Sequence, residues 1–96
     1  MNNEFKQITR QTTAIYRSLR NCKSWITVSD IQKDTGAVPR TIRGTLKGFV
    51  DETLVEVCKA HGGFRYRLNP VQTESAKVLA QRIHAAEKTF GMTEAA

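Results

Sequence analysis

Gly36 and Pro39 divide an otherwise helical stretch of the sequence into two parts. Glycine is favoured just after the end of a helix, and proline is favoured at the first helical position. At the start of the first part, Thr27 is a good N-cap, and Asp30 three residues later completes an approximate capping box. The pattern predicts a short helix over residues 28–35, a turn, and a second helix that begins at Pro39.

Apolar spacing predicts further helices on both sides of this pair. Between Phe5 and Leu19 the apolar positions recur at intervals of three and four, which predicts an amphipathic helix over residues 4–20. A last helix is expected over residues 73–90, with a narrow apolar seam formed by Ala76, Leu79, Ile83, Ala86 and Phe90. In the helix that begins at Pro39, the expected buried stripe consists of Ile42, Leu46, Phe49 and Val50.

Residues 54–69 have the pattern of a β-hairpin. The segment His61-Gly62-Gly63 supplies residues that tolerate positive φ at a tight turn. On the return strand, one set of alternating residues is apolar and the other is basic, which is typical of a strand with one buried and one solvated face. The apolar set is Phe64, Tyr66 and Leu68, and Arg65 and Arg67 are expected to point outward.

Length and charge narrow the class of protein. Ninety-six residues with 40% hydrophobic content fit one domain over residues 1–96. Fifteen Lys and Arg against nine Asp and Glu give a net charge of +6, which favours nucleic acid or an anionic membrane as partner. The apolar runs are short and a signal-peptide core is missing, so we expect a soluble, cytoplasmic protein without a membrane partner. Cys22 and Cys58 are then expected to be reduced thiols.

This order of elements resembles the winged helix-turn-helix superfamily, most visibly between Thr27 and Leu68. Residues typical of bacterial, plasmid or phage members occupy the corresponding positions here, namely Ile31, Gly36, Thr41-Ile42, Leu46, Phe49 and Leu54-Val55. The resemblance implies a mainly α fold with a small β-hairpin, the wing, and here an additional C-terminal helix. It also implies DNA binding by residues 27–51 and by the wing at 54–69. Many members have Gly where this chain has Asp51-Glu52-Thr53.

The resemblance makes the basic residues of the second helix and of the wing the candidates for contact with DNA. Arg40 and Arg43 project from the first turns of the helix that begins at Pro39, where arginine can contact a guanine edge or a phosphate. Thr41 is a weaker candidate for a base or phosphate contact, and Lys47 for a phosphate contact. In the wing, the candidates for backbone or minor-groove contact are Lys59, His61, Arg65 and Arg67. The alternative for all of them is an ordinary solvated surface.

Catalytic and metal-binding chemistry finds little support in the sequence. Cys58 and His61 have a spacing that occurs in metal sites, but residues three apart on a strand point to opposite faces. The same geometry argues against a cysteine nucleophile activated by His61, and there is no phosphate loop or serine triad. We therefore expect no enzyme activity, no cofactor and no metal, and no small-molecule ligand is evident.

The expected function is sequence-specific binding of double-stranded DNA by a transcriptional regulator. Residues 39–51 would read the major groove, while the wing contacts the backbone or the minor groove. The alternative is a winged-helix protein-interaction module of a replication, partition or secretion assembly. The C-terminal seam could pack on the first helix within one chain, or it could form a homodimer through Leu79, Ile83, Ala86 and Phe90, which we favour.

Overall fold

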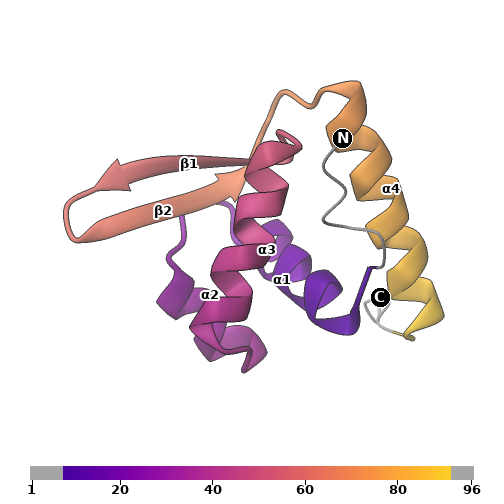
Figure 1. The fold of residues 1–96 in the computed structure, drawn as a ribbon, viewed down its shortest axis with the longest axis horizontal. Coiled ribbons are helices and arrows are strands. Elements are labelled where there is room, and N and C mark those ends of the chain that lie inside the picture. Colours follow the sequence, from indigo (N-terminus) through magenta and orange to yellow (C-terminus); the bar gives the residue numbers. More distant parts are fainter. Residues whose placement is uncertain (1–7, 92–96) are drawn as a thin grey trace.

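The computed structural model describes residues 8–91 and contains helices and one two-stranded antiparallel sheet (Figure 1). The hairpin extends away from the helices, and α4 packs beside α1. In chain order the elements are α1 (Arg10–Asn21), α2 (Val28–Thr35), α3 (Pro39–Asp51), β1 (Val55–Ala60), β2 (Gly63–Leu68) and α4 (Glu74–Thr89). None of the helices within residues 8–91 has the length and apolar character that a membrane span requires.

The ends of α2 and the start of α3 follow from local side-chain chemistry. The Asp30 backbone N–H donates to Thr27 Oγ1 at 3.1 Å, and the Thr27 backbone N–H donates to Asp30 Oδ2 at 3.0 Å. This reciprocal capping box satisfies two donors that a helix start otherwise leaves unpaired. Gly36 ends α2 in the left-handed conformation with φ 76°. Pro39 then occupies the first turn of α3, as its fixed φ favours.

The first helix begins later than the sequence pattern predicts. It starts at Arg10 rather than at residue 4, because Thr9 is extended and its hydroxyl accepts a hydrogen bond from the Thr12 backbone N–H at 3.1 Å. Ile8 precedes the helix but still packs against the core, which explains why the apolar spacing was misleading. Phe5 and the rest of residues 4–7 lie outside the described residues.

The pairing of the wing fixes which side chains share a face. Val57 pairs with Tyr66 and Lys59 pairs with Phe64, and Gly62 and Gly63 adopt φ 91° and 135° at the turn. The free edge of β2 is also paired, since Ile26 and Tyr66 exchange two backbone hydrogen bonds of 2.8 Å. The segment that precedes α2 is therefore bonded directly to the wing.

Thr53 sets the direction in which the chain leaves α3. It adopts φ 61°, a left-handed conformation that glycine tolerates better than a β-branched residue. The conformation is held by a bond from the Thr53 backbone N–H to the Val50 carbonyl at 2.9 Å. The Thr53 and Thr73 hydroxyls lie 2.6 Å apart, so the same residue ties the base of the wing to the cap of α4. Glycine would adopt this conformation at Thr53 with less strain.

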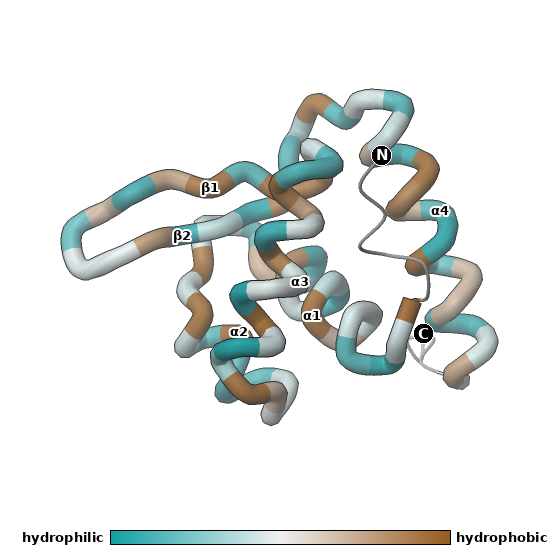
Figure 2. Tube along the Cα trace, in the orientation of Figure 1, coloured by the Kyte–Doolittle hydropathy of each residue, from teal (hydrophilic) through white to brown (hydrophobic). Residues whose placement is uncertain are grey.

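The core is formed by all four helices of the described residues, α1 to α4, along each of which hydrophobic positions recur (Figure 2). Phe49 is fully buried, and its ring meets Tyr16 edge-on with the centroids 6.3 Å apart. Burial raises the pKa of the Tyr16 hydroxyl, and the nearby Arg20 guanidinium opposes this effect. Of the stripe expected on α3, Ile42, Leu46 and Phe49 are buried and Val50 is partly buried.

The apolar seam of α4 is used inside the chain. Ile83 is 0% exposed and Leu79 is 4% exposed, and both belong to the core. Ala86 and Phe90 are half-buried. Packing of α4 on α1 within one chain is therefore the alternative that the structure adopts for this seam. A homodimer stays a prediction, and in this packing its contacts would have to come from side chains other than Leu79 and Ile83.

A buried carboxylate reinforces the contact between α1 and α4. Glu87 is 4% exposed, and Arg20 donates to its two carboxylate oxygens at 3.1 and 2.9 Å. Arg17 Nε lies 3.6 Å from Glu87 Oε2, and His84 Nδ1 lies 3.2 Å from Glu87 Oε1. A buried charge is tolerable only when it is paired in this way. The cluster therefore fixes the position of the C-terminal half of α4 on α1.

The capping box predicts how stability responds to acid. Hydrogen bonds from Thr27 lower the pKa of Asp30, so folding favours the ionised carboxylate. Its stabilising contribution is present above the unfolded value of about 4 and is lost as the pH falls through the lower folded value. We expect Asp30→Ala to lower the melting temperature at neutral pH, and the gap to wild type to shrink in acid. Thermal unfolding followed by circular dichroism at a series of pH values measures this gap.

Asp34→Ala is the matched control, because Asp34 is an exposed carboxylate of the same helix that is not part of the cap. A gap between wild type and Asp30→Ala that stays constant from neutral to acid pH would contradict a role for the ionised cap.

Candidate nucleic-acid interface

The exposed face of α3 carries three basic side chains. Arg40, Arg43 and Lys47 are all exposed, and their spacing of three and four places them on one side of the helix. Thr41 is half-buried beside them. The first turn of α3, which lies within the described residues, contains no acidic side chain, so the positive end of the helix dipole is not offset there. The structure therefore brings the α3 candidates together on a cationic surface.

Lys47 is partly engaged by a neighbour on the same helix. Its Nζ lies 3.3 Å from Asp51 Oδ2, and the Lys47 side chain is 72% exposed. Exposed pairs of this kind stabilise a helix by only about 0.3–0.5 kcal/mol. The lysine can therefore exchange this carboxylate for a phosphate at little cost.

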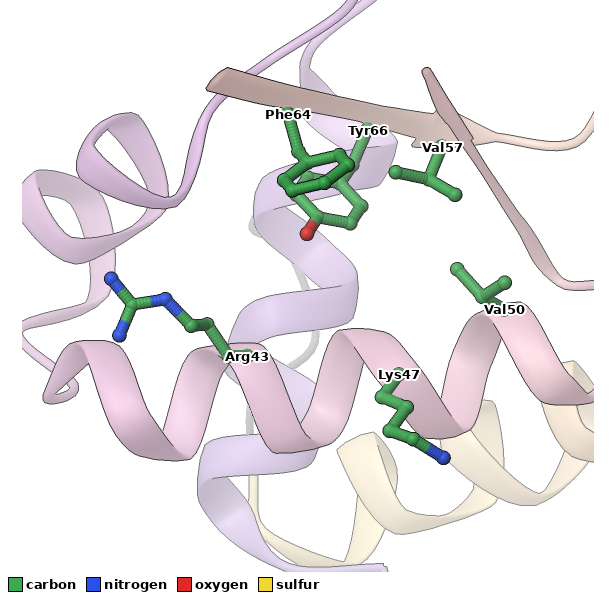
Figure 3. A pocket seen from close by; sticks show the side chains of 6 residues that line it. All are labelled: Arg43, Lys47, Val50, Val57, Phe64 and Tyr66. Atoms are coloured by element: carbon green, nitrogen blue, oxygen red, sulfur yellow. The ribbon is translucent and has the colours of Figure 1, made fainter. Parts of the chain in front are cut away.

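An open groove separates α3 from the wing (Figure 3). It has a volume of about 200 Å³ and is lined by three residues of α3 and three of the wing. In Figure 3 the wing side chains point from the strands toward the helix. The lining residues are Arg43, Lys47, Val50, Val57, Phe64 and Tyr66.

One wing residue, Phe64, was not expected at an accessible surface. Phe64 is 55% exposed and Val57 is 41% exposed, although the alternation of β2 assigned Phe64 to a buried face. The assignment holds at Leu68, which packs against the core, but it fails toward the tip because the hairpin extends past the helices. The available signal was the position of Phe64 directly after Gly62-Gly63, where a strand is farthest from any core.

The arginine side of the wing is engaged rather than simply solvated. Side chains alternate along β2, so Arg65 and Arg67 lie on the face opposite to Phe64 and Tyr66. Arg67 Nε donates to Glu56 Oε2 at 2.7 Å, and its guanidinium lies 4.5 Å from the centre of the Trp25 ring. Arg65 and Arg67 thus lie on the outer face of the wing, as expected, and Arg67, whose side chain is 42% exposed, also holds the wing to the segment before α2.

The remaining wing candidates lie near the tip. Lys59 is exposed on β1, where it is the cross-strand partner of Phe64, and His61 is exposed in the turn. Cys58 is half-buried on β1, and it and Cys22 are free thiols. Across residues 8–91, no three His, Cys, Asp or Glu side chains gather in a way that could hold a metal ion.

No family model and no curated protein matches the chain, and two of the solved structures that share its architecture are regulators. One is Bordetella bronchiseptica BpsR, described in a study of how 6-hydroxynicotinic acid regulates its DNA binding; its TM-score is 0.64 at 17% identity. The other is the transcriptional repressor BigR from Xylella fastidiosa, with a TM-score of 0.56 at 15% identity. The matches cover 93% of this chain, 62% of the BpsR chain and 82% of the BigR chain.

At this level of identity the likeness establishes the fold. Within residues 8–91 this chain has four helices and a two-stranded hairpin, and its fold is shared with these regulators, as the sequence resemblance implied. The regulation of BpsR by 6-hydroxynicotinic acid does not fit the expectation that no small-molecule ligand is evident.

Proposed function

We propose that this chain, which has the winged helix-turn-helix fold, binds double-stranded DNA as a transcriptional regulator. The observation that carries the proposal is the exposed row of Arg40, Arg43 and Lys47 on α3, opposite the face that is buried in the core. A helix with a buried apolar face and an exposed basic face can enter the major groove without loss of core packing. The names of the two structural neighbours, a repressor and a DNA-binding protein, support the same class of function.

The side chains of α3 and those at the tip of the wing have different roles in this proposal. Arg40 and Arg43 contact base edges or phosphates in the major groove, and Thr41 makes a further contact there. Lys47 neutralises a phosphate in place of Asp51. Lys59 and His61, at the exposed tip of the wing, approach the backbone or minor groove.

The arginines of β2 have a different place in the proposal. Arg65 and Arg67 add positive charge on the outer face of the wing, and Arg67 also fixes the wing through Glu56 and Trp25. Their contribution to DNA binding is therefore electrostatic and independent of sequence.

A series of Arg43 variants tests the duplex interface. Arg43→Ala is expected to weaken binding to a duplex selected from a random pool by roughly 1–3 kcal/mol and to relax the preference at one base pair. Arg43→Lys keeps the charge but lacks the bidentate fork, so it should preserve the salt dependence and lose the base preference. Fluorescence anisotropy titrations at several salt concentrations, on matched and single-mismatch duplexes, measure both effects.

Lys23→Ala is the control, since Lys23 is an exposed cation that lines a different surface hollow with Arg20 and Arg67. Equal binding by wild type and Arg43→Ala would make Arg43 an ordinary surface charge. The alternative, a protein-interaction module, predicts little duplex binding by wild type at moderate salt.

A further inference from the structure

We propose that the groove between α3 and the wing binds an unpaired base of single-stranded DNA, with the base against Phe64 and the adjacent phosphates at Arg43 and Lys47 (Figure 3). The site differs from the proposed duplex interface, in which α3 reads paired bases from the major groove. It shares two cations with that interface but does not depend on it.

The chemistry of the groove walls supports a nucleotide as occupant. One wall carries the exposed ring of Phe64, and the other is formed by α3 with Arg43 and Lys47, whose ammonium group points away from the strands in Figure 3. Proteins that bind single strands combine an aromatic stacking surface with a positive groove in the same way. The lining residues, all within the described part of the chain, include no carboxylate, and a phosphate at Lys47 would replace the Asp51 carboxylate that lies 3.3 Å from its Nζ.

The floor of the groove is apolar, and its size suits a base. Val50, Val57 and Tyr66 form the surface between the two walls. The open space of about 200 Å³ is sufficient for a planar heterocycle. A ring that is 55% exposed gains little from the chain's own core, so cover by a base would remove apolar surface from water.

The same groove could in principle take an acidic peptide with an apolar side chain. We favour the nucleotide because Arg43 belongs to the basic row of α3, which already matches a polyphosphate chain. A phosphate backbone meets two cations on successive turns of a helix with evenly spaced charges, whereas a peptide would need a particular acidic sequence.

The test compares two labelled single strands of about ten nucleotides, a length within the usual site size. One is oligothymidylate, and the other is an abasic oligomer that has the same phosphates but no bases. We expect wild type to bind oligothymidylate about five- to 150-fold more tightly than the abasic oligomer. Phe64→Ala should remove this preference, and Phe64→Trp should keep it. Val71→Ala, which truncates a side chain that is 77% exposed elsewhere, should behave as wild type.

Three outcomes would overturn the proposal. They are equal affinity of wild type for the two oligomers, a preference that survives in Phe64→Ala, and tight binding of an acidic peptide with no binding of either oligomer. Circular dichroism confirms that each variant is folded before titration. Duplex binding without base preference in single strands would refute this site and leave the proposed function intact, and the reverse result would refute the proposed function alone.

Discussion

Ile83→Glu is expected to unfold the chain. Ile83 is 0% exposed in the core, so the new carboxylate would be buried without a prepared partner. It would also lie one helical turn from Glu87, whose negative charge already occupies Arg17 and Arg20. Burial of an unpaired charge costs several kcal/mol, which is comparable with the whole stability of a small domain, about 5–15 kcal/mol.

Val78→Glu provides the matched control on the same helix. Val78 is 53% exposed, so its replacement should change the free energy of unfolding by no more than about 0.5 kcal/mol. Thermal unfolding and sedimentation of wild type and both variants at micromolar concentration measure stability and assembly together. A folded, monomeric Ile83→Glu beside a dimeric wild type would contradict this expectation and place Ile83 between two copies of the chain.

Phe49→Ala is expected to lower the free energy of unfolding by about 3–5 kcal/mol. Phe49 is 0% exposed, and its ring fills the space between α3 and Tyr16 of α1. Truncation removes the apolar contacts and leaves a cavity that the surrounding helices can close only in part. Urea unfolding followed by circular dichroism gives the change in free energy.

Phe64→Ala makes the same chemical change at a site that is 55% exposed. It should cost much less stability, because most of the Phe64 ring is already in water. If the two variants lost similar free energy, Phe64 would contribute to the core as much as Phe49 does, and the groove would not be an open surface.

The sequence predicts best what depends on neighbouring residues. The ends of α2 follow from Thr27, Asp30 and Gly36, which act within a few positions of one another. The start of α3 follows from Pro39 alone. The start of α1 was wrong because two local signals compete there, the apolar spacing through Ile8 and the cap at Thr9. The cap prevails, since its hydroxyl satisfies a backbone donor.

Contacts between distant positions were beyond sequence reasoning. Glu87 and Arg20 are 67 positions apart, and nothing local marks this glutamate as buried. The seam of α4 was equally ambiguous, because the same apolar spacing serves a partner helix in the same chain or in a second one. In the structure the seam packs on α1, and the homodimer stays a prediction.

The candidate site was predictable in part. Helical spacing alone places Arg40, Arg43 and Lys47 on one side of α3. Alternation in β2 separates Phe64 and Tyr66 from Arg65 and Arg67, but it cannot tell which face meets α3. That depends on how the wing joins the helices, which Thr53 and Ile26 determine.

The two backbone hydrogen bonds between Ile26 and Tyr66 affect how much conformational entropy the wing loses when a ligand binds. Without them, the hairpin would be joined to the segment before α2 through side-chain contacts such as that of Arg67 with Trp25, and more orientations of the wing would compete. With them, Tyr66 is held at one position relative to the segment that leads into α2. Both walls of the groove are thereby positioned before a ligand binds, so less conformational entropy is lost on binding.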